Sequence, residues 1–173
     1  MQSETIFTVN VWREKYLGDT GIIDKHIRHI QEYDVGRKRS NQDGGYQSHD
    51  ITFGFTELIN FIYKCFVEQK QNVTLANFWI NINKGTQSND VHVHTNNVWS
   101  VVYYHKVCCN KSPIYFESLT PHFPMFETPY LLYPNNQELL FFDGIIPHGV
   151  KACNNANHER ISVAFNFIKV MDD

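Results

Sequence analysis

The sequence predicts a mainly β fold, an antiparallel barrel or jelly roll with α-helices packed on one face. Two helical patterns come first, and a succession of short apolar or alternating runs follows from Val73 onward. Aromatic residues are abundant, with 13 Phe, 9 Tyr and 3 Trp, and such side chains favour half-buried pleated surfaces. At 173 residues the chain fits one domain, since domains commonly have about 100–200 residues. We expect residues 1–173 to form a single domain, with helices at about 20–70 and the barrel at about 73–170.

The first strand and the first helix are predicted from residue spacing. Residues from Thr5 to Trp12 alternate between apolar and polar, which predicts a strand. Ile23, Ile27 and Ile30 then recur at helical spacing, so a helix is expected at roughly 22–33. Asp19 or Thr20 is the expected N-cap.

A polar, glycine-containing loop at 36–50 separates this helix from a second one. The second helix is predicted from near Thr56 to near Lys70, with Glu57 in its first turn. Its expected buried stripe consists of Leu58, Ile59, Ile62, Cys65 and Phe66.

The remainder of the chain is predicted to be strands. Turn residues such as Lys84-Gly85 and Asp143-Gly144 separate the runs. The expected strands are Val73–Asn83, Trp99–Val107, Pro113–Ser118, Pro129–Tyr133, Glu138–Asp143 and Arg160–Val170.

Composition narrows the classes of function. The net charge of −3 and pI of about 6.3 provide no positive field for nucleic acid or acidic lipid. The N-terminus lacks a signal-peptide pattern, and no run approaches the roughly 20 apolar residues that span a membrane. The four cysteines, which form no C-x-x-C pair, are expected to be free thiols of a reducing compartment. These features predict a cytoplasmic protein and leave its oligomeric state open.

Histidines provide the first candidate site. In Asp90-Val91-His92-Val93-His94, two imidazoles stand at i and i+2, and on a strand such side chains leave from the same face. His148 follows an apolar strand and a tight turn, where a barrel could return it to the first pair. Iron(II) sites need three protein ligands on one face and keep other positions open for co-substrate and O₂.

A possible anion-binding pair follows His148. The guanidinium of Arg160 can recognise a carboxylate through two charge-assisted hydrogen bonds. Ser162 lies two residues further on, on the same face of the predicted strand, and can add another hydrogen bond. Tyr104 shares the parity of His92 and His94 and is therefore preferred over Tyr103 as a site residue.

The order of these motifs resembles the iron(II)/2-oxoglutarate-dependent oxygenases, in particular a group of bacterial and phage proteins. The motifs are H-x-H, W-S-V-V-Y-Y, D-G-I-I-P-H and E-R-I-S-V-A-F-N, and the resemblance covers roughly 79–167. It implies a double-stranded β-helix core with His92 and His148 as metal ligands. It also implies that Arg160 and Ser162, as the R-x-S motif, and Tyr104 bind the tail carboxylate of 2-oxoglutarate.

One position departs from this family. The second residue after the first histidine is normally Asp or Glu, but here it is His94. His94 could replace the carboxylate, or it could stay off the metal and leave a position open as in halogenase-type sites, or Asp90 could bind instead. Strand parity favours His94 as the third ligand, which leaves the site one charge more positive than usual.

The resemblance implies an enzyme that uses Fe(II), 2-oxoglutarate and O₂. As a hydroxylase it would couple decarboxylation of 2-oxoglutarate to succinate with oxidation of an unidentified primary substrate. The alternatives are a three-histidine cupin-type dioxygenase that does not use 2-oxoglutarate, and a non-catalytic jelly-roll protein whose metal is lost or is zinc. Loops 36–50 and 119–129 are expected to determine the choice of substrate. The run Arg37-Lys38-Arg39 in the first loop is either solvated or binds an anionic substrate.

Overall fold

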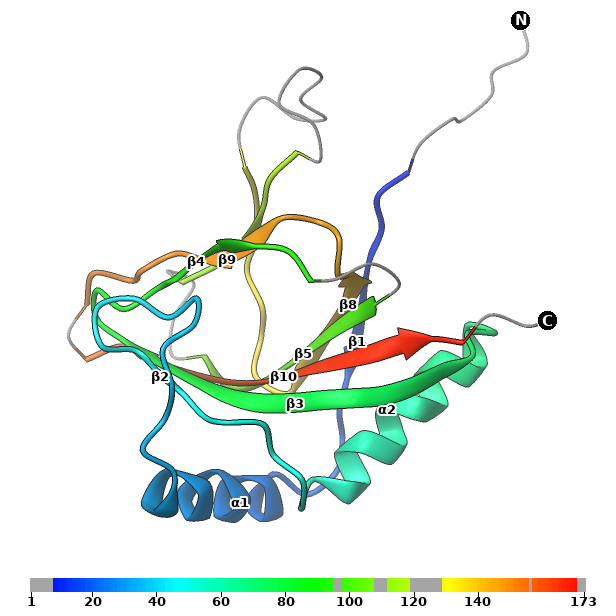
Figure 1. The fold of residues 1–173 in the computed structure, drawn as a ribbon, viewed down its shortest axis with the longest axis horizontal. Coiled ribbons are helices and arrows are strands. Elements are labelled where there is room, and N and C mark those ends of the chain that lie inside the picture. Colours follow the sequence, from blue (N-terminus) through cyan, green and yellow to red (C-terminus); the bar gives the residue numbers. More distant parts are fainter. Residues whose placement is uncertain (1–7, 95–97, 108–111, 119–128, 156, 171–173) are drawn as a thin grey trace, which may run out of the picture.

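The computed structural model describes residues 8–94, 98–107, 112–118, 129–155 and 157–170 (Figure 1). Its helices are α1 (Thr20–Tyr33) and α2 (Thr56–Glu68). Its strands are β1 (Val11–Lys15), β2 (Tyr46–Gln47), β3 (Val73–Lys84), β4 (Asn89–His92), β5 (Val98–Val107), β6 (Ile114–Phe116), β7 (Tyr130–Leu132), β8 (Glu138–Asp143), β9 (His148–Val150) and β10 (Glu159–Lys169).

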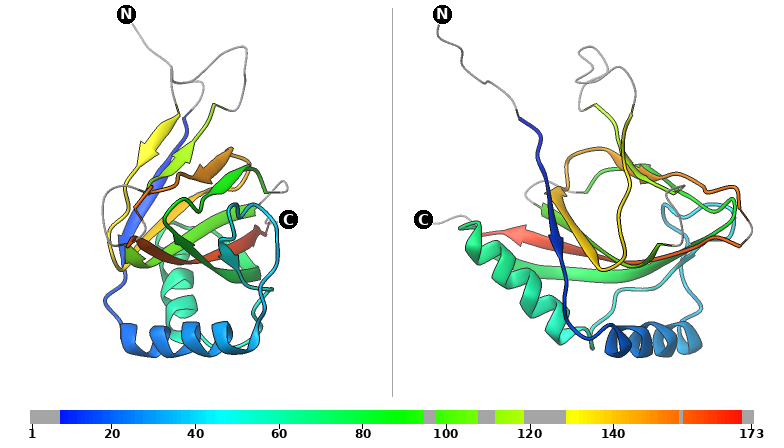
Figure 2. Two further views of the ribbon diagram at one scale, coloured as in Figure 1. Left: turned by 90° about the vertical axis from the view of Figure 1, so that its left-hand side faces the viewer. Right: turned by 180° about the vertical axis from the view of Figure 1, so that it is seen from behind.

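The strands form two antiparallel sheets that face each other. The large sheet has the order β1-β8-β5-β10-β3-β2, and the small sheet has the order β4-β9-β6-β7. In Figure 1 the strands β4 and β9 lie above the large sheet, while both helices cover its lower face; the turned views of Figure 2 show the same layers. The prediction of a jelly roll with helices on one face is therefore confirmed.

Both predicted helices are present, and their apolar stripes pack on the large sheet. Helix α1 buries Ile23, Ile27 and Ile30, and the Asp19 carboxylate caps it by accepting a hydrogen bond from the Gly21 N–H at 2.7 Å. Helix α2 buries Leu58, Ile62 and Phe66 and ends at residue 68, two residues earlier than predicted. The other two members of its predicted stripe, Ile59 and Cys65, are half-buried. Between helices and sheet lies one apolar core, which we call the helix-side core.

A second layer of side chains fills the space between the two sheets. Because side chains alternate along a strand, Tyr103 of β5 belongs to the helix-side core and Tyr104 points between the sheets. Strand β10, which lies between β3 and β5, divides in the same way. Its residues between the sheets include Arg160, Ser162 and Ala164.

Several predicted boundaries were wrong. The first strand is β1 at 11–15 rather than 5–12; residues 1–7 lie outside the described part. Its register is set by antiparallel pairing with β8 and by the Arg13–Glu138 ion pair, at 2.7 Å between Nε and Oε1, which local alternation does not reveal. The predicted loop 36–50 contains the short strand β2, which pairs with β3, and His148 begins a strand of its own, β9.

No helix in the described part of the chain is long and apolar enough to cross a bilayer. Cys65 is a free thiol, as predicted. The other two cysteines, Cys108 and Cys109, lie outside the described residues.

Candidate metal centre and co-substrate pocket

Three histidines meet at one end of the space between the sheets. His92 ends β4 and stands directly opposite His148, the first residue of β9. With His94, each offers a ring nitrogen, and these three atoms lie within 4.8 Å of one another. The ring centroids are separated by 4.5 Å for His92 and His148, 5.1 Å for His94 and His148, and 5.4 Å for His92 and His94. The fold thus brings together the H-x-H motif and the distant histidine.

Hydrogen bonds on Nδ1 leave the other ring nitrogens of this cluster available. The His92 Nδ1–H donates to the Asp90 carbonyl at 2.8 Å, and the His148 Nδ1–H donates to the Ile146 carbonyl at 2.7 Å. A carbonyl only accepts, so Nδ1 must carry the proton and Nε2 keeps its lone pair. His94 Nδ1 lies 2.5 Å from Asn166 Oδ1 and 3.1 Å from Ser100 Oγ. Nε2 of His92 and of His148 is therefore free to bind a metal ion, and His94 lies close enough to add a third nitrogen.

The environment keeps the imidazoles of His94 and His148 uncharged. Burial, together with the neighbouring His92 and His94, lowers the pKa of His148 to about 3. Burial lowers the pKa of His94 to about 4, although the hydrogen bond with Asn166 acts in the opposite direction. Neutral imidazole is the form that binds metal ions.

Asp90 takes a different position. Its side chain accepts a hydrogen bond from Gln42 Nε2 at 2.5 Å, and within the described residues the potential metal-binding cluster contains only the three histidines. The geometry therefore favours His94 over Asp90 as a third ligand. Three neutral nitrogen ligands fit a divalent ion such as iron(II) or zinc.

A buried cation lies deeper between the sheets. Arg160 is only 2% exposed, and its Nη1 donates to Ser162 Oγ at 3.4 Å. The guanidinium carbon lies 4.9 Å from the centre of the Tyr104 ring, over its face. Burial lowers the pKa of Arg160. Among the described residues no carboxylate pairs with it, and its Nε has no acceptor.

A buried charge without a partner is costly, so this arrangement fits an anionic ligand that completes the pair. One narrow cavity connects the guanidinium with the histidines: its lining includes His92, His148, Arg160 and Ser162. Tyr104 does not line this cavity; its hydroxyl is buried and makes no hydrogen bond within the described part of the chain. A dicarboxylate could reach from the metal cluster to Arg160 along the cavity.

A larger cavity of about 790 Å³ opens on the other side of His92 and His94. One of its walls is the segment 37–40, which carries Arg37, Lys38 and Arg39. This segment is held in place: the Asp90 N–H donates to the Ser40 carbonyl at 2.8 Å, and the Arg39 N–H donates to Asn41 Oδ1 at 2.7 Å. The volume lies within the range of about 300–1,000 Å³ that small-molecule sites occupy.

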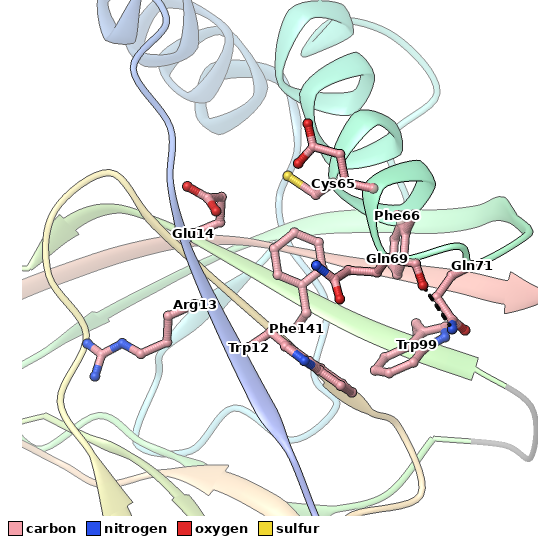
Figure 3. Close-up of a pocket in the computed structure, with 10 residues that line it drawn as sticks. Trp12, Arg13, Glu14, Cys65, Phe66, Gln69, Gln71, Trp99 and Phe141 are labelled. Atoms are coloured by element: carbon pink, nitrogen blue, oxygen red, sulfur yellow. Dashed lines mark hydrogen bonds between the residues drawn. The ribbon is translucent and has the colours of Figure 1, made fainter.

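A third pocket lies at a distance from this site, between β1 and α2 (Figure 3). Its aromatic walls are Trp12, Phe66, Trp99 and Phe141, and it shares no lining residue with the two cavities at the histidines. Burial raises the pKa of Cys65, which lines this pocket, to about 11, so the thiol stays protonated and is a poor nucleophile. The pocket holds none of the predicted site residues.

Sequence reasoning did not find the polar partners of His94. Asn166 stands on β10 with the same parity as Arg160 and Ser162, and Ser100 lies opposite it on β5. The shared parity with Arg160 and Ser162 could have indicated that Asn166 also faces the space between the sheets. Loop 119–129 was also predicted to contribute to substrate choice, but its residues 119–128 lie outside the described part of the chain.

Comparison with known proteins agrees with this architecture. Similar solved structures include HygX from Streptomyces hygroscopicus with nickel and 2-oxoglutarate bound (TM-score 0.67, 10% identity, 93% of this chain and 83% of that one). A prolyl hydroxylase from Trichoplax adhaerens in complex with a hypoxia inducible factor peptide gives a TM-score of 0.65 at 14% identity, over 91% of this chain and 83% of the other. A Pseudomonas putida prolyl-4-hydroxylase gives 0.63 at 13% identity, over 95% of both chains. At these identities the likeness establishes the fold.

The sequence itself identifies the family. No curated protein matches the chain, but the family model described as "Putative 2OG-Fe(II) oxygenase" matches residues 77–166, more than half of its length. This match confirms the predicted cofactors, Fe(II), 2-oxoglutarate and O₂. The chain therefore belongs to the iron(II)- and 2-oxoglutarate-dependent oxygenases.

Proposed function

We propose that this enzyme is a hydroxylase whose iron(II) is held by His92, His94 and His148. The observation that carries the proposal is the shared cavity, which is lined by three imidazoles and by a buried guanidinium without a carboxylate partner among the described residues. The likeness to two prolyl hydroxylases supports hydroxylation as the reaction type.

Each residue has one task in this proposal. The three histidines bind and orient the ion through nitrogens whose opposite ring positions are already hydrogen-bonded. Arg160, Ser162 and the buried hydroxyl of Tyr104, which has no partner among the described residues, bind the distal carboxylate of 2-oxoglutarate. Bound iron would supply the activation of O₂ that couples formation of succinate and CO₂ to substrate oxidation.

The primary substrate is proposed to occupy the cavity of about 790 Å³. Lys38 and Arg39 on its wall are exposed, and neither forms an ion pair with a described residue. Asp90 and Asp50 also line this cavity, but Gln42 and Arg37 already bind their carboxylates. Gln42 is neutral and leaves the charge of Asp90 in place, but three cationic side chains against two carboxylates give the cavity wall a net positive charge. This charge favours a substrate with an anionic group.

The two alternatives named above fit less well. A cupin-type dioxygenase without 2-oxoglutarate leaves the buried charge of Arg160 unexplained, and the family match decides against it. Zinc suits three neutral histidines as well as iron does, so the metal must be measured. Metal analysis of protein purified without oxygen should give iron or an empty site that takes up Fe(II).

The test of the proposed function uses two variants and two ligands. Titration of Co(II) and of 2-oxoglutarate should show that His148→Ala loses the metal, whereas Arg160→Ala keeps the metal and loses 2-oxoglutarate. Fe(II)-loaded wild type should release succinate from 2-oxoglutarate, slowly when no primary substrate is added. Equal loss of both ligands in Arg160→Ala would show that Arg160 is structural, and O₂ uptake without succinate would contradict the proposal.

A further inference from the structure

His94 has a different kind of hydrogen-bond partner from the other two histidines of the cluster. The Nδ1 atoms of His92 and His148 face backbone carbonyls, which can only accept a hydrogen bond. His94 faces the side-chain amide of Asn166 instead. An amide can present either its oxygen or its NH₂ group, so this contact alone leaves two tautomers of His94 open.

The amide of Asn166 is the first link of a longer chain of hydrogen bonds. Its Nδ2 donates to Asn77 Oδ1 at 3.0 Å, and Asn77 Nδ2 donates to Asp50 Oδ2 at 3.2 Å. Arg37 Nη2 donates to the other oxygen of Asp50 at 2.5 Å. These contacts run from the candidate metal ligand to a carboxylate at the protein surface, and we call the residues 50, 77, 166 and 94 the amide relay.

The carboxylate gives the amide relay a direction. An ionised Asp50 only accepts, so Asn77 must turn its NH₂ group toward it and its oxygen toward Asn166. Asn166 must then direct its NH₂ group at Asn77 and its oxygen at His94. The proton of His94 consequently sits on Nδ1, and the lone pair of Nε2 faces the cluster.

The opposite direction is excluded by the same groups. If Ser100 donated to an unprotonated Nδ1, Asn166 would have to present its NH₂ group to His94 as well. Both amides would then be reversed, and Asn77 Oδ1 would face the carboxylate of Asp50, oxygen against oxygen. That contact replaces a hydrogen bond with repulsion. Hydrogen bonds from Asn77 and Arg37 outweigh burial and lower the pKa of Asp50, which keeps it ionised.

We infer that Asp50 is a positioning residue that, through Asn77 and Asn166, sets the tautomer of His94 for metal binding. The strand register brings these residues together. Asn77 and Asn166 are direct cross-strand partners on β3 and β10, and Ser100 on β5 stands opposite Asn166. All four residues of the relay line the 790 Å³ cavity. The metal-binding consequence rests on the proposed function; the tautomer does not.

The tautomer can be read directly in the metal-free protein. With ¹⁵N-labelled histidine at pH 7.5, two-bond correlations distinguish a proton on Nδ1 from one on Nε2. We expect wild type to show His94 protonated on Nδ1 alone. Asp50→Asn, which can donate as well as accept, should show a mixture of both tautomers. The substituted side chain is exposed and similar in size, so folding is retained.

A matched control separates the relay from the ion pair. Arg37→Gln breaks the same ion pair but leaves the Asp50 carboxylate as an acceptor, so the tautomer of His94 should stay on Nδ1. A second control, Asp24→Asn, removes an equivalent surface carboxylate that pairs with Arg28 on helix α1, at 2.6 Å. It should leave His94 unchanged too.

Metal affinity is the second readout. In Asp50→Asn only part of the molecules carry the binding tautomer, so the affinity for Co(II) should fall about 2–10-fold. Asn166→Leu, which removes the contact itself, should lower it about 10–100-fold. Neither control variant should change it more than about twofold.

The outcomes distinguish this inference from the proposed function. A single Nδ1–H tautomer in Asp50→Asn, or the same mixture in Arg37→Gln, would overturn the relay. A mixture of tautomers with unchanged Co(II) affinity would confirm the relay but show that His94 is not a ligand. Failure to bind 2-oxoglutarate would contradict the proposed function and leave the tautomer result intact.

Discussion

The two faces of strand β10 are built from the same eleven-residue segment yet serve different ends. On the helix side, Ile161, Val163, Phe165 and Phe167 belong to a continuous apolar core. On the side between the sheets, Arg160 and Ser162 are equally inaccessible, at 2% and 1% exposure, but polar. Polar groups on this second face lack complete hydrogen bonding within the described residues, as Arg160 Nε does.

The face of β10 toward the helices stabilises the fold, whereas the face between the sheets carries polar groups of the candidate site. The helix-side core gains stability from burial of apolar area. The inner face carries buried polar groups that cost stability unless a ligand completes their contacts. Substitutions on the first face should therefore reduce stability and spare binding, and substitutions on the second should do the reverse.

The largest expected effect is on the helix side. Phe167 is fully buried, with its ring 5.1 Å from Phe66 and 5.3 Å from Tyr63. Phe167→Ala should lower the free energy of unfolding by about 3–5 kcal/mol, because it removes buried area and leaves a cavity. Urea denaturation measures this. Molecules that remain folded should bind Co(II) as wild type does, and a parallel loss of metal would show that the two faces are not independent.

The inner face should give the opposite pattern. Arg160→Met should weaken binding of 2-oxoglutarate by about 2–5 kcal/mol, since a buried charge-assisted contact is lost. Stability of the ligand-free protein should stay the same or rise, because replacing an unpaired buried charge with an apolar side chain removes a desolvation penalty. Calorimetric titration and urea denaturation of the same sample check both halves. A marked loss of stability would mean that Arg160 has a structural partner.

The histidine cluster predicts a pH dependence for the metal-free protein. The folded pKa values of His94 and His148, about 4 and about 3, lie below the value of about 6.5 in an unfolded chain. Below pH 6.5 the unfolded state therefore binds more protons, so stability falls as the pH is lowered, by up to about 1.4 kcal/mol per pH unit for each group. Urea denaturation between pH 7 and pH 5 measures the slope. His148→Leu should reduce it, and an unchanged slope would place the titration elsewhere.

The contrast between the two faces also explains which parts of the fold could be predicted from the sequence. The helix-side residues follow simple periods of 3.6 and 2, so α1, α2 and the long strands β3, β5 and β10 were predicted. Strands such as β2 and β9 have two and three residues, too few to show a period. The β1 register depends on its partner β8, and local spacing could not reveal it.

Some residues of the candidate site could be predicted from the sequence, and others could not. The positions of His92, His148, Arg160 and Ser162 were predicted from the order of motifs, because a resemblance supplies the tertiary arrangement that spacing lacks. The amide relay was missed, since Asn77 and Asn166 lie 89 positions apart and meet only through the pairing of β3 with β10. Neighbours across a sheet carry no local signature in the chain.

The smallest expected effect compares two adjacent residues, and it tests the two faces most directly. Tyr103 and Tyr104 are both fully buried, and neither hydroxyl has a hydrogen-bond partner among the described residues. Tyr103 faces the helix-side core, while Tyr104 lies under Arg160. Tyr104→Phe should weaken 2-oxoglutarate binding by about 1 kcal/mol, the net value of one hydrogen bond, whereas Tyr103→Phe should leave that affinity unchanged. Calorimetric titration of both variants resolves the difference, and equal affinities would remove the Tyr104 hydroxyl from the co-substrate site.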